Sequence, residues 1–223
     1  MPILKNIYGA IFKTPDYLGR RGEKAVVKKL RKLNFWGWRG KLLRNLYVPK
    51  GNGETTEVDL VYITRKGIFV LESKNYAGQI FGSEENRNWL SAICTGRTWL
   101  GRRKLEKRYF YNPVWQNRTH IRCLQRYLGM EVPMHSVVVF SQHCELRRIS
   151  DLSSDVAVCQ LRRLPGIIRK IWRRQWRSLS EAQVEKIYRE LRPLTRSDLS
   201  VRREHIREVK RLDAGRKLAT LWW

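Results

Sequence analysis

Hydrophobic and polar positions divide the chain into a helical start, a strand-rich middle and a helical end. At residues 19–33 apolar side chains recur every three or four positions, which predicts an amphipathic helix with Val26, Val27 and Leu30 on its apolar stripe. Short apolar runs bounded by turn residues follow and predict strands. These strands are expected at 41–49, 57–64, 67–75, 78–82, 88–94, 97–100, 135–140 and 156–161, with a tight turn at Thr95-Gly96.

Helix signals interrupt the strands once and dominate the end of the chain. Asn112 before Pro113 and Gly129 at the far end predict a helix over 113–128. Helices are also expected at 164–177, at 180–191 with a capping box, and at 198–212. The order of elements predicts an α/β or α+β fold in which helices flank the sheet.

The hairpin at residues 57–75 carries its charges at the open end, away from the turn. If Thr64 pairs with Gly67 across a two-residue turn, Asp59 lies opposite Glu72, and Lys74 projects from the same face as Glu72. A three-residue turn would shift the pairing by one residue and send the two carboxylates to opposite faces. The sequence leaves both turns open.

The net charge of the chain restricts the kind of molecule that it is expected to bind. The 223 residues include 46 Lys and Arg but only 20 Asp and Glu, a net charge of +26. Such an excess favours a polyanionic partner, nucleic acid before an anionic membrane. The apolar stretch at the N-terminus is too short to span a bilayer and shows no signal-peptide pattern, so we expect a cytoplasmic protein without stable membrane association.

The four cysteines are widely spaced and form no CxxC pair. They predict small buried thiols in a reducing compartment. A zinc site at His143 and Cys144 is the weaker alternative, because zinc motifs usually show close pairs of ligands.

Adjacent carboxylates on a half-buried sheet repel each other, and a divalent cation removes that cost. With Lys74 beside them, Asp59 and Glu72 are the minimal set for phosphodiester hydrolysis assisted by Mg²⁺ or Mn²⁺. The competing interpretation is a solvated strand face with alternating charges. Glu23 also falls on the apolar stripe of the first helix, although a favourable interaction with the helix N-terminus explains it equally well.

Several motifs together resemble the nuclease-related domain family of the PD-(D/E)xK nuclease superfamily. They are GRRGE at 19–23, TTEVDLVYIT at 55–64, GIFVLESKNYAGQIFG at 67–82, Trp89, NPVWQN at 112–117 and VVVF at 137–140. The resemblance implies an α/β restriction-endonuclease-like core with a central mixed sheet flanked by helices. It implies an active-site set of Glu23, Asp59, Glu72, Lys74 and Gln116. Val58 stands where the superfamily name has proline.

This resemblance also suggests how the chain is divided. We expect an N-terminal segment at 1–18, a nuclease-related core at 19–160 and a basic helical C-terminal extension at 161–223. Basic clusters in the core and the extension are candidates for nucleic-acid contacts: Arg20, Arg21, Arg102, Arg103, Lys104, Arg173 and Arg174. Each cluster alone is equally typical of a solvated surface. Aromatic residues among them could stack on unpaired bases, although most of the nine tryptophans are expected in the core.

The sequence therefore predicts a nuclease that uses Mg²⁺ or Mn²⁺, with Asp59 and Glu72 as metal ligands and Lys74 assisting the attacking water. DNA is the expected substrate, and RNA stays open beside it. His120, one turn after Gln116, is expected to be a packed or hydrogen-bonded histidine and not a general base. The alternatives are a nucleic-acid-binding module with an unused active site and a peripheral membrane protein. The complete carboxylate and lysine set favours the enzyme.

Overall fold

A mixed five-stranded sheet forms the centre of the computed structural model, which describes residues 15–34, 39–97, 99–100 and 102–195. Its strands are β1 (Lys41–Pro49), β2 (Thr55–Thr64), β3 (Gly67–Lys74), β7 (Met134–Phe140) and β9 (Val156–Gln160), in the order β1-β2-β3-β7-β9. The first three strands are antiparallel, and β7 and β9 run parallel to β3. Parallel pairing requires crossover connections. The connection from β3 to β7 includes α3 (Pro113–Leu128), and residues 141–155 connect β7 to β9.

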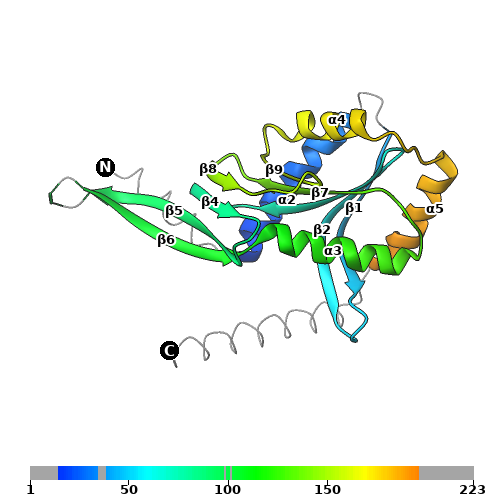
Figure 1. Cartoon of the computed structure of the whole chain (residues 1–223), viewed down its shortest axis with the longest axis horizontal. Coiled ribbons are helices and arrows are strands. Elements are labelled where there is room, and N and C mark those ends of the chain that lie inside the picture. The colour runs from blue at the N-terminus through cyan, green and yellow to red at the C-terminus, as the bar shows by residue number, and fades with distance from the viewer. Residues whose placement is uncertain (1–14, 35–38, 98, 101, 196–223) are drawn as a thin grey trace.

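Helices cover both faces of this sheet (Figure 1). On one face α2 (Pro15–Leu33) and α4 (Leu164–Arg174) pack through Leu30 and Ile168 against side chains such as Phe69. On the other face α3 and α5 (Glu181–Leu191) pack through Leu124 and Ile187. A short 3₁₀ helix, η2 (Arg192–Thr195), follows α5. The predicted α/β fold with a central mixed sheet flanked by helices is confirmed, and it is consistent with a restriction-endonuclease-like core.

A second sheet projects from the side of the core (Figure 1). It contains β4 (Gly78–Ser83), β5 (Asn88–Arg97), β6 (Arg103–Tyr111) and β8 (Cys144–Ser150), in the order β6-β5-β4-β8. The expected strand at 97–100 and its turn at Thr95-Gly96 are wrong, because β5 continues to Arg97 and pairs with Arg103. β6 and β8 were not predicted. Their charged sequences lack an apolar run because these strands bury little of their surface.

Helices α4 and α5 complete the covering layers of the central sheet. Leu164 and Ile168 are fully buried among side chains of α2 and the sheet, and Ile187 and Leu191 are fully buried on the opposite face. Within the described part of the chain, residues 161–195 thus share the core of the preceding strands. The helix expected at 198–212 and the segment before residue 15 lie outside the described residues. None of the helices described is long and apolar enough to cross a bilayer.

Candidate active site

The β2–β3 hairpin takes the register that brings its charges together. Thr64 pairs with Gly67 across the two-residue turn Arg65-Lys66, and the pairing continues to Leu60 and Leu71. Gly67 has a φ of 106°, and a Cβ atom there would lie 2.3 Å from the carbonyl oxygen of Pro133. Glycine is therefore the residue that fits this position. The pairing of Thr64 with Gly67 confirms the two-residue alternative.

The two strands separate just beyond the last pair. β3 continues along β7 through Lys74, whereas β2 continues along β1 back to Thr55. In the opening between them, Oδ2 of Asp59 accepts a hydrogen bond of 2.8 Å from the backbone N–H of Ser73. This hydrogen bond joins the two strands where their ladder of backbone pairs ends. It also holds the Asp59 carboxylate near Glu72.

An irregularity in β2 aims Asp59 at this opening. Val58 and Val61 both face the α3 and α5 side of the sheet, although strict alternation would place them on opposite sides. The β1–β2 ladder passes from the pair Arg44–Leu60 to the pair Leu46–Val58. Asn45 and Asp59 stand between these pairs, and Asn45 has a φ of 51°. Such local kinks re-aim side chains next to functional sites.

Glu72, Lys74 and Gln116 form a connected group between β3 and α3. Nζ of Lys74 lies 2.7 Å from Oε1 of Glu72 and donates a hydrogen bond of 2.9 Å to Oε1 of Gln116. The side chain of Glu72 is only 2% exposed and that of Lys74 17%. A buried charge pair with an amide at its end holds the lysine ammonium in one place.

The protonation equilibria of these groups differ because their surroundings differ. Burial and the nearby carboxylate of Glu72 raise the pKa of Asp59 well above its ordinary value, despite Lys74 and the Ser73 N–H. Burial also acts to raise the pKa of Glu72, but Lys74 and His120 outweigh it and lower the pKa to about 2. Burial acts against the charged lysine, yet Glu72 and Asp59 raise the pKa of Lys74. Glu72 and Lys74 are therefore an ion pair, and the repulsion between the two carboxylates acts mainly on Asp59.

His120 connects the site to the far end of β2. Its Nε2 lies 3.2 Å from Oε2 of Glu72, and its Nδ1 lies 2.9 Å from Oγ1 of Thr56. Both ring nitrogens thus have a polar partner, a carboxylate oxygen on one side and a threonine hydroxyl on the other. The prediction of a hydrogen-bonded histidine is confirmed. The contact with Glu72 was not predicted, and the spacing of one helical turn from Gln116 is the one signal for it in the sequence.

Glu23 reaches the site from α2, on the other side of the sheet. It is buried, its Oε2 lies 3.5 Å from an Nη atom of Arg44, and its charge contributes to the raised pKa of Asp59. Glu57, by contrast, accepts a hydrogen bond from Asn45 at the rim, in agreement with a surface role. Four elements, α2, β2, β3 and α3, thus bring the predicted residues together.

Residues 18–141 match the family model of the nuclease-related domain, and this range includes every member of the site. The chain belongs to the nuclease-related domain family. This family is part of the PD-(D/E)xK superfamily, so membership points to a nuclease-related function. An uncharacterized protein of Bacillus anthracis is 29% identical over 193 residues, which cover 86% of this chain and 84% of the relative. No solved structure matches the chain significantly.

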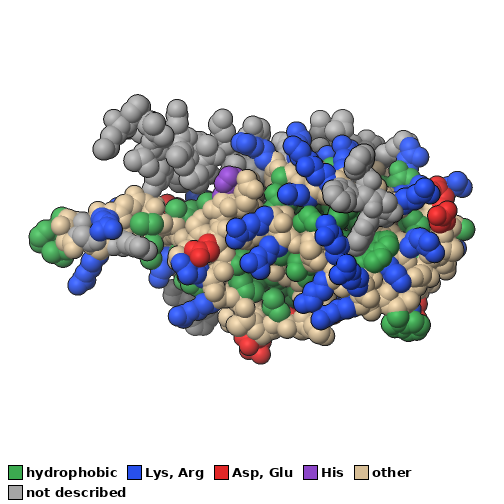
Figure 2. Space-filling model, turned by 90° about the horizontal axis from the view of Figure 1, so that it is seen from above, with side chains coloured by type: hydrophobic (Ala, Val, Ile, Leu, Met, Phe, Trp, Pro, Cys, Tyr) green, Lys and Arg blue, Asp and Glu red, His purple; other side chains and the backbone are tan. Residues whose placement is uncertain are grey.

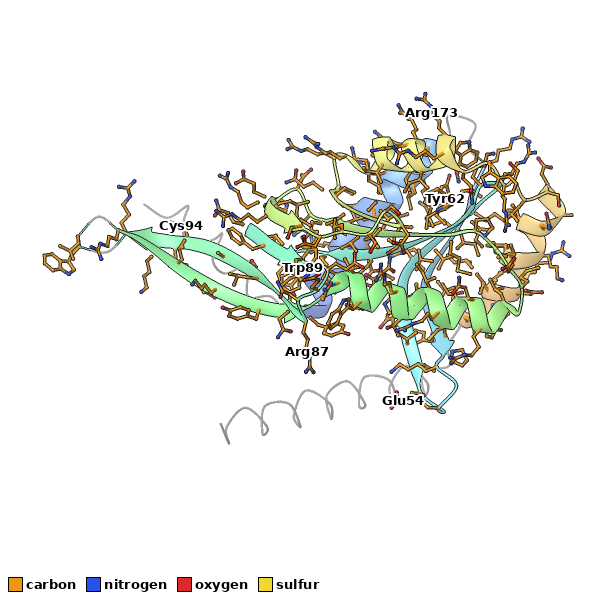
Figure 3. All side chains as sticks on the ribbon, viewed as in Figure 1. Glu54, Tyr62, Arg87, Trp89, Cys94 and Arg173 are labelled. Carbon is orange, nitrogen blue, oxygen red and sulfur yellow. The ribbon has the colours of Figure 1, made fainter. Side chains whose placement is uncertain are left out.

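The basic residues expected to contact nucleic acid lie on separate parts of this nuclease-related domain protein. Arg21 is exposed on α2, Arg102 and Lys104 are exposed near the end of the β5–β6 hairpin, and Arg173 and Arg174 are exposed on α4. Arg20 lies on α2 and Arg103 on β6, and their side chains are outside the described set. Figure 3 shows the hairpin at one end of the molecule and Arg173 on α4, well away from it.

Over the described ranges, no group of three or more His, Cys, Asp and Glu side chains is placed to hold an ion. His143 and Cys144 therefore gain no further ligand there. All four cysteines are free thiols; Cys123, Cys144 and Cys159 are buried as expected, whereas Cys94 is exposed.

Proposed function

We propose that the chain is a metal-dependent nuclease that hydrolyses phosphodiester bonds in DNA. The observation that carries the proposal is the convergence of Asp59, Glu72 and Lys74 where β2 and β3 separate. Burying Glu72 fully, and Asp59 and Lys74 in part, is costly and is not required by the sheet itself. Perturbed titratable groups gathered in this way are typical of catalytic sites.

The donor set fits a hard divalent cation, Mg²⁺ or Mn²⁺. Asp59 is partly exposed, and its raised pKa reflects burial and repulsion from Glu72, both of which a cation between the carboxylates would relieve. Asp59 and Glu72 would hold the ion, with water and substrate phosphate as the remaining ligands. When bound, such an ion polarises the phosphate and lowers the pKa of its water.

Lys74 has the position and charge of a group that acts on the reacting atoms. Its contacts with Glu72 and Gln116 use two of its three N–H donors, so the third can orient the attacking water or an oxygen of the phosphate. Its raised pKa keeps the ammonium charged at neutral pH, which favours stabilisation of negative charge in the transition state over proton abstraction.

The other members position these groups. His120 holds Oε2 of Glu72 from α3, while Gln116 holds Lys74 from the same helix face. Glu23 adds negative charge near Asp59 and is itself compensated by Arg44. A cation at the paired carboxylates would benefit from this extra charge, although Glu23 is on the opposite side of the sheet.

One observation favours a second candidate, a nucleic-acid-binding module whose active site is unused. Both oxygens of Glu72 already have partners, Lys74 at Oε1 and His120 at Oε2. A carboxylate has about four acceptor positions, so these contacts still leave room for a metal ion. Both candidates would bind nucleic acid, and they differ in whether the bound strand is cleaved.

The deciding experiment is a cleavage assay on single- and double-stranded DNA, in linear and circular form, with RNA in parallel. Each substrate is incubated with Mg²⁺, with Mn²⁺ and with EDTA. We expect cleavage of DNA in the presence of either metal and none in EDTA. Binding without cleavage under every metal and substrate combination would favour the unused site, and cleavage in EDTA would contradict the metal requirement.

A further inference from the structure

The β5–β6 hairpin presents a row of aromatic and aliphatic side chains to solvent. Along β6, Leu105, Tyr109 and Tyr111 alternate with Phe110, which packs into the core against Trp89 and Phe140. Because side chains of a strand alternate between its faces, the three share the outward face. Leu105 is 50% exposed, Tyr109 69% and Tyr111 40%. We call Leu105, Tyr109 and Tyr111 the β6 row.

The β6 row continues onto α3. The rings of Tyr111 and Trp115 are 6.3 Å apart at an interplanar angle of 71°, an edge contact across the strand-to-helix junction. Both rings line an open hollow of about 540 Å³, together with Arg118, Arg122 and Met134. Asp155 also lines it and forms an ion pair with Arg118. A chain that follows the row therefore reaches a hollow with aromatic, apolar and guanidinium groups.

This surface is strongly cationic as well as aromatic. Residues 88–111 include six Lys and Arg but a single acid, Glu106. Lys107 lies between Leu105 and Tyr109 on the outward face and is exposed. Figure 2 shows hydrophobic and basic side chains side by side on the projecting hairpin. Of the five tryptophans among the described residues, Trp89 is buried, Trp115 and Trp172 are partly buried, and Trp99 and Trp176 are 92% and 80% exposed, so most of these five do not fill the core.

We propose that the β6 row and the hollow on α3 bind single-stranded nucleic acid, which specifies the form of substrate for the nuclease function proposed above. Unpaired bases stack on exposed aromatic rings while nearby cations follow the phosphates. Paired bases within a duplex offer no free faces to Tyr109 and Tyr111. A lipid surface would meet the tip of the hairpin, where Trp99 is 92% and Leu100 61% exposed. The β6 row instead runs along the strand and ends at Arg118 and Arg122, which favours an extended polyanion.

Binding measured in EDTA tests the proposal separately from catalysis. The full chain is titrated into a labelled oligothymidylate, a duplex of equal length and vesicles rich in anionic lipid. We expect Tyr109→Ala and Tyr111→Ala each to weaken oligothymidylate binding by about 5- to 150-fold, the range for losing one stacked base. Tyr109→Phe keeps the ring and should bind like the wild type. Tyr127→Ala, on an exposed tyrosine of α3 outside the row, is the matched control.

Three results would overturn the inference. They are unchanged oligothymidylate binding by both alanine variants, an equal loss of binding to the duplex, and row-dependent binding to vesicles alone. Because no metal is present, a wild type that never cleaves would remove the proposed nuclease function and leave this test unaffected. A wild type that cleaves while both row variants bind normally would remove only the present inference.

Discussion

Glu72 and His120 face each other across the contact between β3 and α3, with Oε2 and Nε2 3.2 Å apart although 48 residues separate them in the chain. The opposite oxygen of Glu72 lies 2.7 Å from the ammonium of Lys74. A carboxylate held from both sides cannot turn freely, so its remaining acceptor positions have a fixed direction. This rigidity is what a metal ligand or a charge-positioning residue requires.

Replacing Glu72 by glutamine is expected to abolish cleavage while DNA binding stays equal or becomes slightly stronger. An amide is a poor ligand for Mg²⁺, and removing a negative charge near the phosphate reduces repulsion. Cleavage and binding are measured on the same preparations after a check of folding. Glu57→Gln is the control, because Glu57 lies at the rim of the same hairpin and bonds to Asn45. Normal cleavage by Glu72→Gln would show that the site is wrongly assigned.

Lys74→Ala is expected to reduce turnover by about 10²- to 10³-fold, as for the loss of one donor that stabilises transition-state charge. Lys74 also helps to lower the pKa of Glu72, so that pKa should rise in the variant. Single-turnover rates measure the first effect, and the pH dependence of unfolding measures the second. Lys66→Ala removes a lysine at the other end of the hairpin, where its Nζ bonds to Ser178, and should cleave normally.

Asp59→Asn is expected to stabilise the metal-free protein at neutral pH. The folded-state pKa of Asp59 is raised, so the folded state binds a proton that the unfolded state releases, and stability falls as pH rises above about 4. Glu72 acts in the opposite direction, and its contribution is lost as pH falls toward 2. The variant should therefore lose less stability between acidic and neutral pH, which denaturant unfolding in EDTA would measure.

The same variant tests metal binding without any cleavage assay. A ligand that binds only the folded state raises stability in proportion to the logarithm of its concentration. Mg²⁺ should thus raise the melting temperature of the wild type and have a smaller effect on Asp59→Asn. An equal shift in both proteins would place the ion elsewhere.

Nucleic-acid binding is expected to weaken steeply with salt, because lysines and arginines that neutralise phosphates release condensed counterions. If about six phosphates are contacted, affinity for a single strand should fall by roughly 10²- to 10³-fold between about 50 and 200 mM salt. Binding isotherms at the two ionic strengths check this. An affinity that does not change with salt would mean that the net charge of +26 serves another purpose.

Ile187→Ala is expected to destabilise the protein by about 2–5 kcal/mol, the usual cost of such a truncation in a core. Ile187 is fully buried between α5 and the central sheet. If α5 shares one core with the strands, unfolding should stay a single transition with a lower midpoint. Lys186→Ala, with a 63% exposed side chain, is the control. A separate early transition in Ile187→Ala would mark the C-terminal helices as an independent unit.

Local patterns predicted most of the central sheet and the charged set Asp59, Glu72 and Lys74, whereas Glu23 and Gln116 were assigned to the site through the family resemblance. Alternating and continuous apolar runs predicted β1, β2, β3, β7 and β9. Helix α3 begins after Asn112 and ends before Gly129, as its capping residues predicted. β6 and β8 were missed, because exposed strands do not need an apolar face. The register that brings Asp59 near Glu72 depended on the turn before Gly67, whose type the sequence left open, and the two strands separate just before these residues would pair.

Turn residues, caps and apolar spacing act over a few positions, so the sequence predicted the local elements, and its family motifs indicated which residues could perform the chemistry. How those residues meet depended on packing between distant segments. The kink at Asn45 and Asp59, the contact of His120 with Glu72, and the covering of the sheet by α4 and α5 all join segments far apart in the chain. Such contacts form because buried polar groups need hydrogen-bond partners and apolar faces need cover. The partners lie far away in the chain, so no local sequence pattern predicts them.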